Sequence, residues 1–480
     1  ATAKAVVLNK NKMLSSNVIP TGENVSKAAE AVMNHTLDKI GLSRDQMRYV
    51  ISTGYGRRAV QFADEVITEI SCHAKGVSSL ISEARASGGG TVQEGWSPTG
   101  VYPVQEVYYP GTEKLAKDEI RVIACGSGMP MPRLKQAAAC FLIELGNGEK
   151  FIFDVGTGSF TTLYALGIPL DYMTKIFISH QHADHMGDLP TLWIYGMQNG
   201  RSKPLDIWGP GGGGMPESWG TKAAMDGILQ FYNWMLETSK GGLDTRSLAM
   251  NVHEFDWSKP NNVIYDEGGV VIRTIPAIHL EGSVSFILEY AGKKIAFSGD
   301  TLANQWWTEA AKCADLAIHE CFLPNREFVE RYKFQPAEAM YVSTMVHTTA
   351  PVFGKIMALT QPKLAVAYHF QNDPDTLPDV VTEVRKVYDG PVDFAVDGMV
   401  WNITNEGIRT RVAMMNSQPF PPPSVTARQQ AAPGGEKYET PEWVLQGFEW
   451  QTLELMDAIH EEFNAEYGTD FKFQLRPKSE

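Results

Sequence analysis

Four side chains with metal-binding atoms lie within six residues of one another: His180, His182, Asp184 and His185. Imidazole nitrogens and carboxylate oxygens suit Zn²⁺ and similar divalent ions. Burying three histidines and one aspartate together without a cation would be very costly, because these polar groups would lose their hydration. Four such ligands can serve two ions if alternate side chains point to different metals. The run therefore predicts a two-metal site.

The metal-binding run follows a short apolar segment, residues 175–178, which has the length of a buried strand. Three other apolar segments, residues 271–278, 294–299 and 364–368, each end in a ligand-type residue; these residues are His279, Asp300 and His369. A surface turn could explain any one of them. Loops at strand ends can converge on one edge of a cleft, so we expect all three to complete the metal shell.

Composition limits the classes of protein that this chain can represent. Of its 480 residues, 43% are hydrophobic and 20% are charged, which is typical of a globular protein. No apolar run approaches the ~18 residues of a membrane span. The amino terminus shows no basic stretch followed by an apolar core, so we expect a cytoplasmic protein, unless a signal peptide for the periplasm or for secretion has been removed.

Shifts in composition divide the chain into five segments, with residues 119–415 as the main domain. There, short apolar strands alternate with Gly-rich turns and a few helices, which favours an α/β sandwich. The predicted segments are a small α/β segment at 1–80, a linker at 81–118, the main domain at 119–415, a Pro/Gly-rich linker at 416–436 and an amphipathic helix at 437–480, beginning near Pro441.

Residues 49–58 and 67–76 closely resemble the activator ATPases of 2-hydroxyacyl-CoA dehydratases and benzoyl-CoA reductases. The resemblance covers about the first 80 residues, whereas such ATPases are several times longer. It implies a Gly-rich phosphate loop before Thr2, which the sequence does not contain. We therefore expect this segment to be a structural or interaction remnant rather than an active ATPase.

Residues 120–400 resemble the metallo-β-lactamase superfamily, and most closely its branch containing tRNase Z and related phosphodiesterases. Besides the strand-end residues, the motifs that carry this resemblance are residues 126–130, 153–158, 298–301, 318–320 and 347–349. The resemblance implies an αββα sandwich and a metal-dependent hydrolase. It also implies one metal held by His180, His182 and His279, and a second held by Asp184, His185 and His369, with Asp300 bridging and Asp154 supporting the site.

Two such ions, about 3.5 to 4 Å apart, would bind a shared water and lower its pKa towards neutrality. The expected nucleophile is then a metal-bound hydroxide. Zinc is the expected metal, with Mn²⁺ and Fe²⁺ as alternatives, because all three accept this ligand set. By resemblance, Asp184 orients or deprotonates the water, His347 stabilises charge or protonates the leaving group, and Glu320 orients His347.

Two features favour a small-molecule ester, namely a phosphodiester, a sulfate ester or a lactone, over a nucleic acid as substrate. The net charge is −14, whereas nucleic-acid-binding proteins usually present clustered Lys and Arg. The tRNase Z arm is commonly inserted between the residues matched by His279 and Asp300, where this chain has room only for a hairpin. The alternative is a tRNA 3′-end processing endonuclease.

A rival from another class is a scaffold or regulatory module in which the metals are only structural. The insertion at residues 208–266 could roof the pocket, although its aromatic side chains are more often part of a core. The carboxy-terminal helix could dock on the core or on a second subunit, which leaves a homo-oligomer open.

Overall fold

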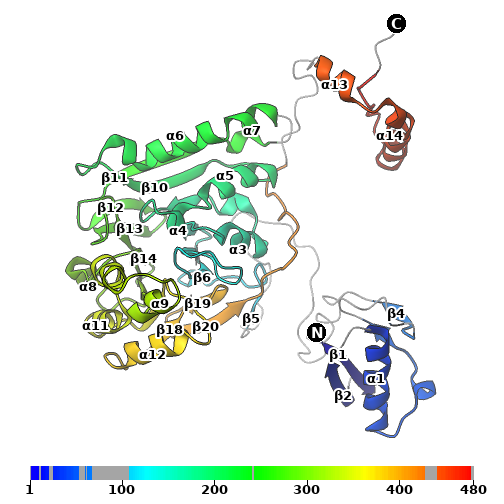
Figure 1. The fold of residues 1–480 in the computed structure, drawn as a ribbon, viewed down its shortest axis with the longest axis horizontal. Helices are drawn as coiled ribbons and strands as arrows, with labels where there is room; N and C mark the ends of the chain where they lie inside the picture. Colours follow the sequence, from blue (N-terminus) through cyan, green and yellow to red (C-terminus); the bar gives the residue numbers. More distant parts are fainter. Residues whose placement is uncertain are drawn as a thin grey trace. The chain divides into compact units, whose positions relative to one another are not determined.

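The computed structural model describes residues 2–9, 12–20, 25–52, 60, 62–66, 107–239, 243–427 and 441–476 (Figure 1). The ATPase-like stretch at 67–76, the Gly/Ser/Pro-rich stretches at 88–90 and 97–100, and the Gly pair at 434–435 lie outside these residues. Contacts divide the chain into two units: Ala1–Gln105 with Gly111–Lys114, and Glu106–Pro110 with Leu115–Glu480.

The first unit is built on a hairpin and one helix. Its elements are β1 (Thr2–Asn9), β2 (Lys12–Pro20), α1 (Val25–Asp38), η1 (Arg44–Gln46), β3 (Ile51–Ser52) and β4 (Glu65–Val66). The antiparallel pair β1 and β2 buries Val7, and α1 buries Val32 and Leu37. The chain leaves the helix through Gly41, whose φ of +64° is easily adopted only by glycine.

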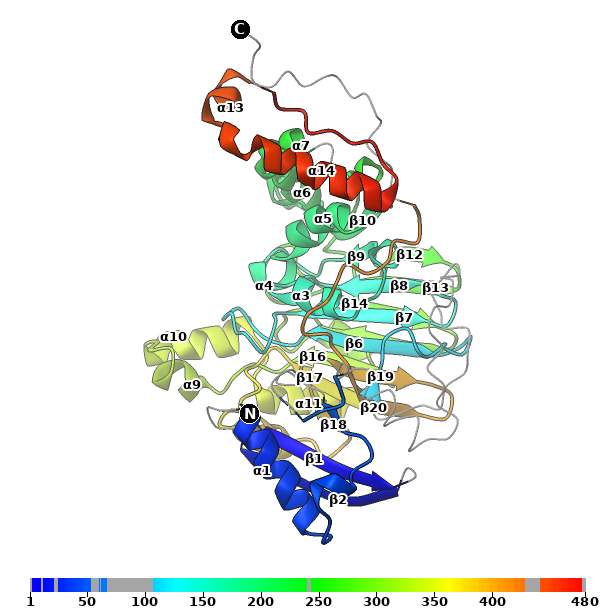
Figure 2. The same cartoon turned by 90° about the vertical axis from the view of Figure 1, so that its right-hand side faces the viewer.

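Two sheets form the second unit. The first has the order β11-β10-β9-β8-β7-β6-β19-β20-β5, and the second has the order β12-β13-β14-β15-β16-β17-β18. Figure 2 shows β8, β7, β6 and β19 following one another across the first sheet.

The strands of the first sheet are β5 (Val107–Tyr108), β6 (Ile120–Gly126), β7 (Cys140–Leu145), β8 (Lys150–Phe153), β9 (Lys175–Phe177), β10 (Leu205–Gly211), β11 (Met250–Asp256), β19 (Met399–Ile403) and β20 (Ile408–Ala413). Those of the second are β12 (Asn262–Glu267), β13 (Val270–Pro276), β14 (Val284–Tyr290), β15 (Lys293–Phe297), β16 (Leu316–Glu320), β17 (Leu364–Tyr368) and β18 (Val392–Phe394).

An aromatic core holds the two sheets together. Phe153 of the first sheet lies with its ring centroid 5.0 Å from that of Phe286 and 5.7 Å from that of Phe297, both in the second sheet. All three side chains are fully buried. Aromatic pairs at these separations contribute about 0.5 to 1.5 kcal/mol beyond the burial of their area. This contact lies just before the strand ends at which the predicted metal ligands begin.

Helices cover the outer faces of the sheets. The first group is α3 (Ser159–Ala165), α4 (Ala183–Met186), α5 (Leu189–Gln198), α6 (Thr221–Phe231) and α7 (Asn233–Thr238), with η3 (Leu170–Tyr172), η4 (Glu217–Trp219) and η5 (Thr245–Ser247) between them. The second group is α8 (Gln305–Ala310), α9 (Asn325–Glu330), α10 (Pro336–Tyr341), η6 (Val342–Val346), α11 (Ala350–Thr360) and α12 (Leu377–Arg385). The second group packs on the second sheet through a separate apolar core (Figure 1). This arrangement confirms the predicted αββα sandwich.

The predicted carboxy-terminal helix is interrupted. The structure has α13 (Glu442–Gly447), η7 (Trp450–Thr452) and α14 (Leu453–Tyr467). Phe448 adopts an extended conformation that ends α13, and the side chain of Glu449 accepts a hydrogen bond from Gln451 N to begin the next turn. Among the described residues, no helix is long and apolar enough to cross a bilayer.

Gly156 joins the fold to the metal-binding run. A Cβ atom at this position would lie 2.1 Å from the carbonyl oxygen of Asp184 and 2.9 Å from the carbonyl carbon of Ala138. Both neighbours are backbone atoms, which cannot rotate away. The loop after β8 and the metal-binding run can therefore pack this closely only with glycine at position 156.

We expect Gly156→Ala to lower the free energy of unfolding by about 1 to 3 kcal/mol, the usual cost of overpacking. Gly227→Ala is the matched control, because Gly227 lies within α6 and, apart from the backbone of its own helix, no atom of the described residues lies within 4 Å of the added Cβ. That control should be neutral or stabilising by up to about 1 kcal/mol. Chemical denaturation followed by circular dichroism measures both changes. Equal stability of the Gly156→Ala variant and the wild type would contradict the close packing.

Candidate metal centre

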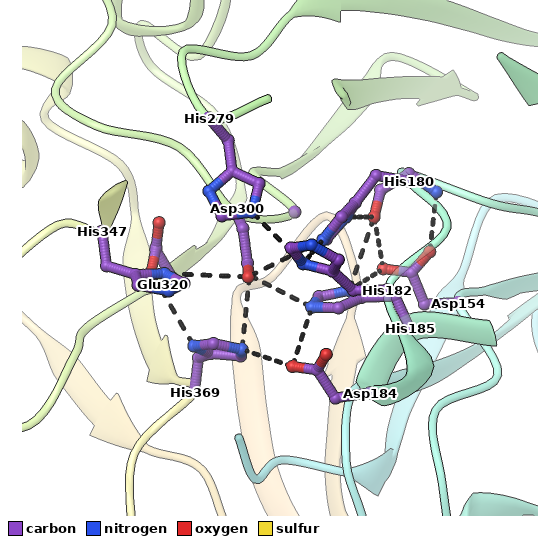
Figure 3. A network of polar contacts seen from close by, with 12 residues as sticks. Asp154, His180, His182, Asp184, His185, His279, Asp300, Glu320, His347 and His369 are labelled. Carbon is purple, nitrogen blue, oxygen red and sulfur yellow. Dashed lines mark hydrogen bonds and ion pairs between the residues drawn. The ribbon is translucent and has the colours of Figure 1, made fainter. Parts of the chain in front are cut away.

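Seven predicted ligand residues come together at one edge of the sandwich (Figure 3). Each lies where the sequence pattern placed it, after the end of a strand. The residues are His180 and His182 after β9, Asp184 and His185 on α4, His279 after β13, Asp300 after β15, and His369 after β17. The structure thus brings together every residue that was expected to hold metal, although their role as ligands stays a prediction.

The first ligand group contains His180, His182, His279 and Asp300, which offer ligand atoms within 4.8 Å of one another. Nε2 of His180 lies 3.1 Å from Nδ1 of His182, and Nε2 of His279 lies 3.4 Å from the same Nδ1 atom. His182 is exposed and His279 is half-buried, whereas His180 and Asp300 are buried. The centre is therefore accessible from the side of His182 and His279.

The second ligand group contains Asp184, His185, His369 and again Asp300, all buried. Nε2 of His369 lies 3.1 Å from Oδ2 of Asp184 and 3.4 Å from Oδ1 of Asp300. Nε2 of His185 lies 3.2 Å from Oδ1 of Asp300. Asp300 therefore belongs to both groups, as expected for a carboxylate that bridges two ions.

Unsatisfied polar atoms show that this cluster fits a cation. Among the described residues, both carboxylate oxygens of Asp300 and Nε2 of His185 are buried without a hydrogen-bond partner. Buried polar atoms are normally paired, because an unpaired one costs about 1 to 3 kcal/mol. A nitrogen and oxygen ligand set of this kind is suited to divalent ions such as Zn²⁺.

Loss of hydration also keeps the first-group imidazoles in the form that binds metal. Full burial lowers the pKa of His180 well below its usual value, and partial desolvation by the surrounding cluster lowers the pKa values of the more exposed His182 and His279. Burial opposes the charge on Asp300, yet His185 and His369 hold the pKa of Asp300 well below its usual range. Neutral imidazoles and an ionised carboxylate are the protonation states that metal binding requires.

The buried carboxylate of Asp154 orients the ring of His185 by contacting the ring nitrogen that faces away from the ligand groups. Asp154 accepts hydrogen bonds from Ser179 N at 2.7 Å, from Ser179 Oγ at 2.7 Å and from Nδ1 of His185 at 2.7 Å. These contacts turn Nε2 of His185 towards the second ligand group. In the same way, Nδ1 of His279 contacts the carbonyl oxygen of Val346 at 3.0 Å. Such outer contacts fix the ring orientation of metal-binding histidines.

His347 and Glu320 form a pair beside the shared carboxylate. Nδ1 of His347 lies 2.9 Å from Oε2 of Glu320 and 3.7 Å from Oδ2 of Asp300. Thr301 N donates to Oε1 of Glu320 at 2.5 Å. Phe322 stacks on the His347 ring with a centroid separation of 4.0 Å. Burial raises the pKa of Glu320 well above its usual value and lowers the pKa of His347.

Sequence reasoning missed Phe322, Ser179 and Asp397. Asp397 accepts hydrogen bonds from the backbone N–H groups of Ser127 and Ala137, at 3.0 and 2.6 Å, and burial raises its pKa to about 6. It follows β18, so the strand-end rule that found the ligands would also have found it. The contacts of Phe322 and Ser179 depend on tertiary packing and carry no separate sequence signal.

The stretch between His279 and Asp300 is short, as predicted. It consists of β14 and β15 joined by a tight turn, where Ala291 and Gly292 have φ values of +47° and +76°. The insertion between β10 and β11 is the longer one. The expectation that its aromatic side chains form a core is wrong for Phe231 and Trp234, which are 79% and 77% exposed.

Comparison with protein families gives a match for each of two parts of the chain. Residues 135–312 match the metallo-beta-lactamase superfamily, and residues 1–92 match the BadF/BadG/BcrA/BcrD ATPase family. These matches confirm the two resemblances that the sequence motifs suggested. The metallo-β-lactamase fold implies divalent metal ions at its ligand cluster.

Curated relatives carry the name Ribonuclease Z. The protein from Treponema pallidum strain Nichols is 38% identical over 92 residues, which cover 19% of this chain and 29% of that protein. The protein from Mycolicibacterium gilvum is 24% identical over 224 residues, which cover 45% of this chain and 73% of that protein. The chain therefore spans less than a third of the length of the first of these relatives.

Two solved structures are similar to the chain over a little more than half of its length. The short form of human tRNase Z matches with a TM-score of 0.43 and 22% identity, covering 58% of this chain and 98% of that one. The metallo-beta-lactamase fold protein YhfI from Bacillus subtilis matches with a TM-score of 0.44 and 18% identity, covering 59% of this chain and 100% of that one.

The relatives named Ribonuclease Z contradict the expectation that a small-molecule substrate is favoured over nucleic acid. The expectation failed because it relied on the net charge of the whole chain. The total of −14 includes segments remote in sequence from the site, such as α14 with Glu454, Asp457, Glu461, Glu462 and Glu466. A sum over the whole chain therefore says little about the surface near the metal centre.

Architecture, ligand cluster and family match agree with one another. The strand ends of the αββα sandwich hold the ligand set, and residues 135–312 match the superfamily directly. Residues 135–312 therefore match the metallo-β-lactamase superfamily, and they lie in a sandwich that has the fold of that superfamily and gathers a candidate metal-binding cluster.

Proposed function

We propose that this protein is a metal-dependent endoribonuclease of the ribonuclease Z type, which hydrolyses a phosphodiester bond in precursor tRNA. The observation that carries the proposal is the His347–Glu320 pair beside Asp300, within reach of both ligand groups. Phosphodiester cleavage needs a cationic centre for the phosphate and a proton for the departing oxygen, and this arrangement offers both. The name shared by the curated relatives supports RNA as the substrate.

Two divalent ions, preferably Zn²⁺, would occupy the site, with Mn²⁺ and Fe²⁺ as alternatives. His180, His182 and His279 would hold one ion, and Asp184, His185 and His369 would hold the other. Asp300 would contact both. When bound, the ions supply positive charge to the reacting phosphate and lower the pKa of the attacking water.

Asp184 is our candidate for orienting the attacking water. Oδ2 of Asp184 contacts His369 and His185 at 3.1 and 3.4 Å, so this oxygen points into the second ligand group. The other oxygen remains for a water. Burial would raise the pKa of Asp184, but His185 and a hydrogen bond from His369 lower it, so the carboxylate is ionised and can accept a hydrogen bond.

His347 is our candidate for protonating the leaving oxygen. Its Nδ1 atom contacts the carboxyl group of Glu320. A hydrogen bond between them needs one proton, carried either by Nδ1 or by Glu320. With a proton on Glu320 and a neutral ring, the remaining ring proton lies on Nε2. When Nε2 donates this proton to the leaving oxygen, Nδ1 takes up the proton of Glu320, so the ring stays neutral and Glu320 becomes a carboxylate. Glu320 and Phe322 act as positioning residues, because they hold the ring without reaching the substrate.

The test of the proposed function is cleavage of a precursor tRNA with a 3′ trailer by the purified, metal-loaded full chain. We expect cleavage by the wild type and loss of about 10² to 10⁴ in rate for Asp184→Ala, the range for a positioned acid–base group. Mapping of the product ends by sequencing reports the cleaved bond. Equal cleavage by wild type and Asp184→Ala would point to a contaminating nuclease and contradict the proposal.

Asp300→Asn should reduce the metal content of the purified chain, because the amide cannot supply a negative charge to two cations at once. Elemental analysis of wild type and variant after identical reconstitution measures the ratio. We expect about two ions per wild-type chain and fewer in the variant. Asp206→Asn is the matched control, since this half-buried carboxylate accepts a hydrogen bond from Asn251 on a neighbouring strand. Unchanged metal content in Asp300→Asn would contradict a bridging role.

His347→Ala should slow cleavage of RNA by about 10² to 10⁴, because the departing ribose oxygen then leaves without a proton. The same variant should lose much less activity on bis(p-nitrophenyl) phosphate, whose leaving group needs no proton. Steady-state kcat values with both substrates give the comparison. Equal losses with the two leaving groups would assign His347 to binding or structure instead.

A further inference from the structure

The segment between β10 and α6, residues 212–220, contacts the chain next to the two accessible ligands, His182 and His279; we call it the mouth loop. The carbonyl oxygen of Trp219 accepts a hydrogen bond from Nε2 of Gln181 at 2.5 Å. Gln181 lies between the predicted ligands His180 and His182. The mouth loop is thus attached directly to the metal-binding run.

A second contact ties the mouth loop to the other accessible ligand. Met215 is buried, and its sulfur lies 2.7 Å from where a Cβ atom of Gly282 would be. Gly282 belongs to the turn that follows His279 and has a φ of +88°. The mouth loop therefore packs on the chain beside His279 as well as beside His182, and these are the two ligands that solvent reaches.

Trp219 presents a large apolar side chain to solvent at this place. Its side chain is 57% exposed, although its backbone is fixed by the contact with Gln181 and by a hydrogen bond from Trp219 N to the carbonyl oxygen of Pro216 at 2.9 Å. A rigid backbone with an exposed ring is suited to binding, because little conformational freedom is lost when a partner covers the ring.

We propose that Trp219 stacks on the base of a nucleotide next to the scissile phosphate and so positions single-stranded RNA at the metal centre. This inference rests on the proposed function. A base is the favoured partner because every base has a flat face, so stacking tolerates any sequence. Glu217 is the one charged residue of the mouth loop, so this segment can bind RNA through ring contact but offers no positive charge for the phosphates.

A contact from Trp219 would matter for RNA binding because the chain has no room for a tRNase Z arm between His279 and Asp300. With only the β14–β15 hairpin between His279 and Asp300, grip on the RNA has to come from elsewhere. The insertion that begins with the mouth loop is longer and lies in contact with the metal-binding run. A stack at the cleavage site would hold the substrate where the reaction occurs rather than at a distance.

The experiment is a cycle that combines a protein change with a substrate change. Wild type and Trp219→Ala each cleave a precursor RNA that is either intact or abasic at one of the two nucleotides flanking the cleaved bond, and each of these two positions is tested in turn. We expect Trp219→Ala to lower kcat/KM on intact RNA by roughly tenfold to a hundredfold, the range for one lost stack. Wild type should lose a similar factor on the abasic RNA, and the variant should lose almost nothing further.

Two further variants separate stacking from damage to the fold. Trp219→Phe keeps a ring and should recover most of the activity that Trp219→Ala loses. Trp234→Ala removes a tryptophan that is 77% exposed on α7 of the same insertion, and it should show the wild-type response to the abasic nucleotide. Metal content is measured for every variant, and we expect it to match that of the wild type.

The outcomes distinguish this inference from the function on which it rests. Suppose that the wild type cleaves RNA, but that the abasic nucleotide lowers kcat/KM by the same factor in Trp219→Ala as in the wild type at both flanking positions. Trp219 then contacts no flanking base, and the inference is wrong. An equal loss in Trp219→Phe also overturns it. If the wild type cleaves no RNA, the proposed function fails and this inference fails with it.

Discussion

Asp300 lies between the two ligand groups, and within the described part of the chain neither of its buried carboxylate oxygens has a hydrogen-bond partner. An ionised carboxylate in this position is stable only if positive charge surrounds it, because burial removes its hydration. In the protein alone, His185 and His369 are the nearest groups that can supply such charge. Two bound cations would meet the same need and leave the imidazoles neutral. The organisation of the site follows from this single buried charge.

The sandwich fold meets that need by bringing separate strand ends to one edge. His279 and Asp300 follow strands of the second sheet, and His180 follows β9 of the first. The contact of Phe153 with Phe286 and Phe297 fixes one sheet against the other directly beneath these ends. A shift of about 1 Å in this contact would move the two halves of the ligand set apart, and catalysis tolerates such shifts poorly.

The sequence allowed the sandwich and the gathering of the ligands to be predicted, because both follow from local patterns. Apolar strands that end in His or Asp are visible one segment at a time, and parallel strand ends share an edge. The packing of Phe322 on His347 and the bond from Gln181 to Trp219 join residues that are distant in the sequence, and no local pattern marks them. The interruption of the last helix at Phe448 also escaped prediction, since the apolar spacing continues across it.

Substrate choice was the least predictable property, because it depends on surfaces rather than on the ligand set. Total charge gave the wrong answer, since acidic residues on α14 count towards the sum whatever their distance from the site. The length of the hairpin between His279 and Asp300 is a sounder constraint, because it limits which part of the chain can reach a long substrate. For the proposed RNA substrate, binding energy would then come from residues around the metal centre itself. Binding energy from contacts beside the reacting phosphate can stabilise the transition state, so such contacts can serve catalysis as well as affinity.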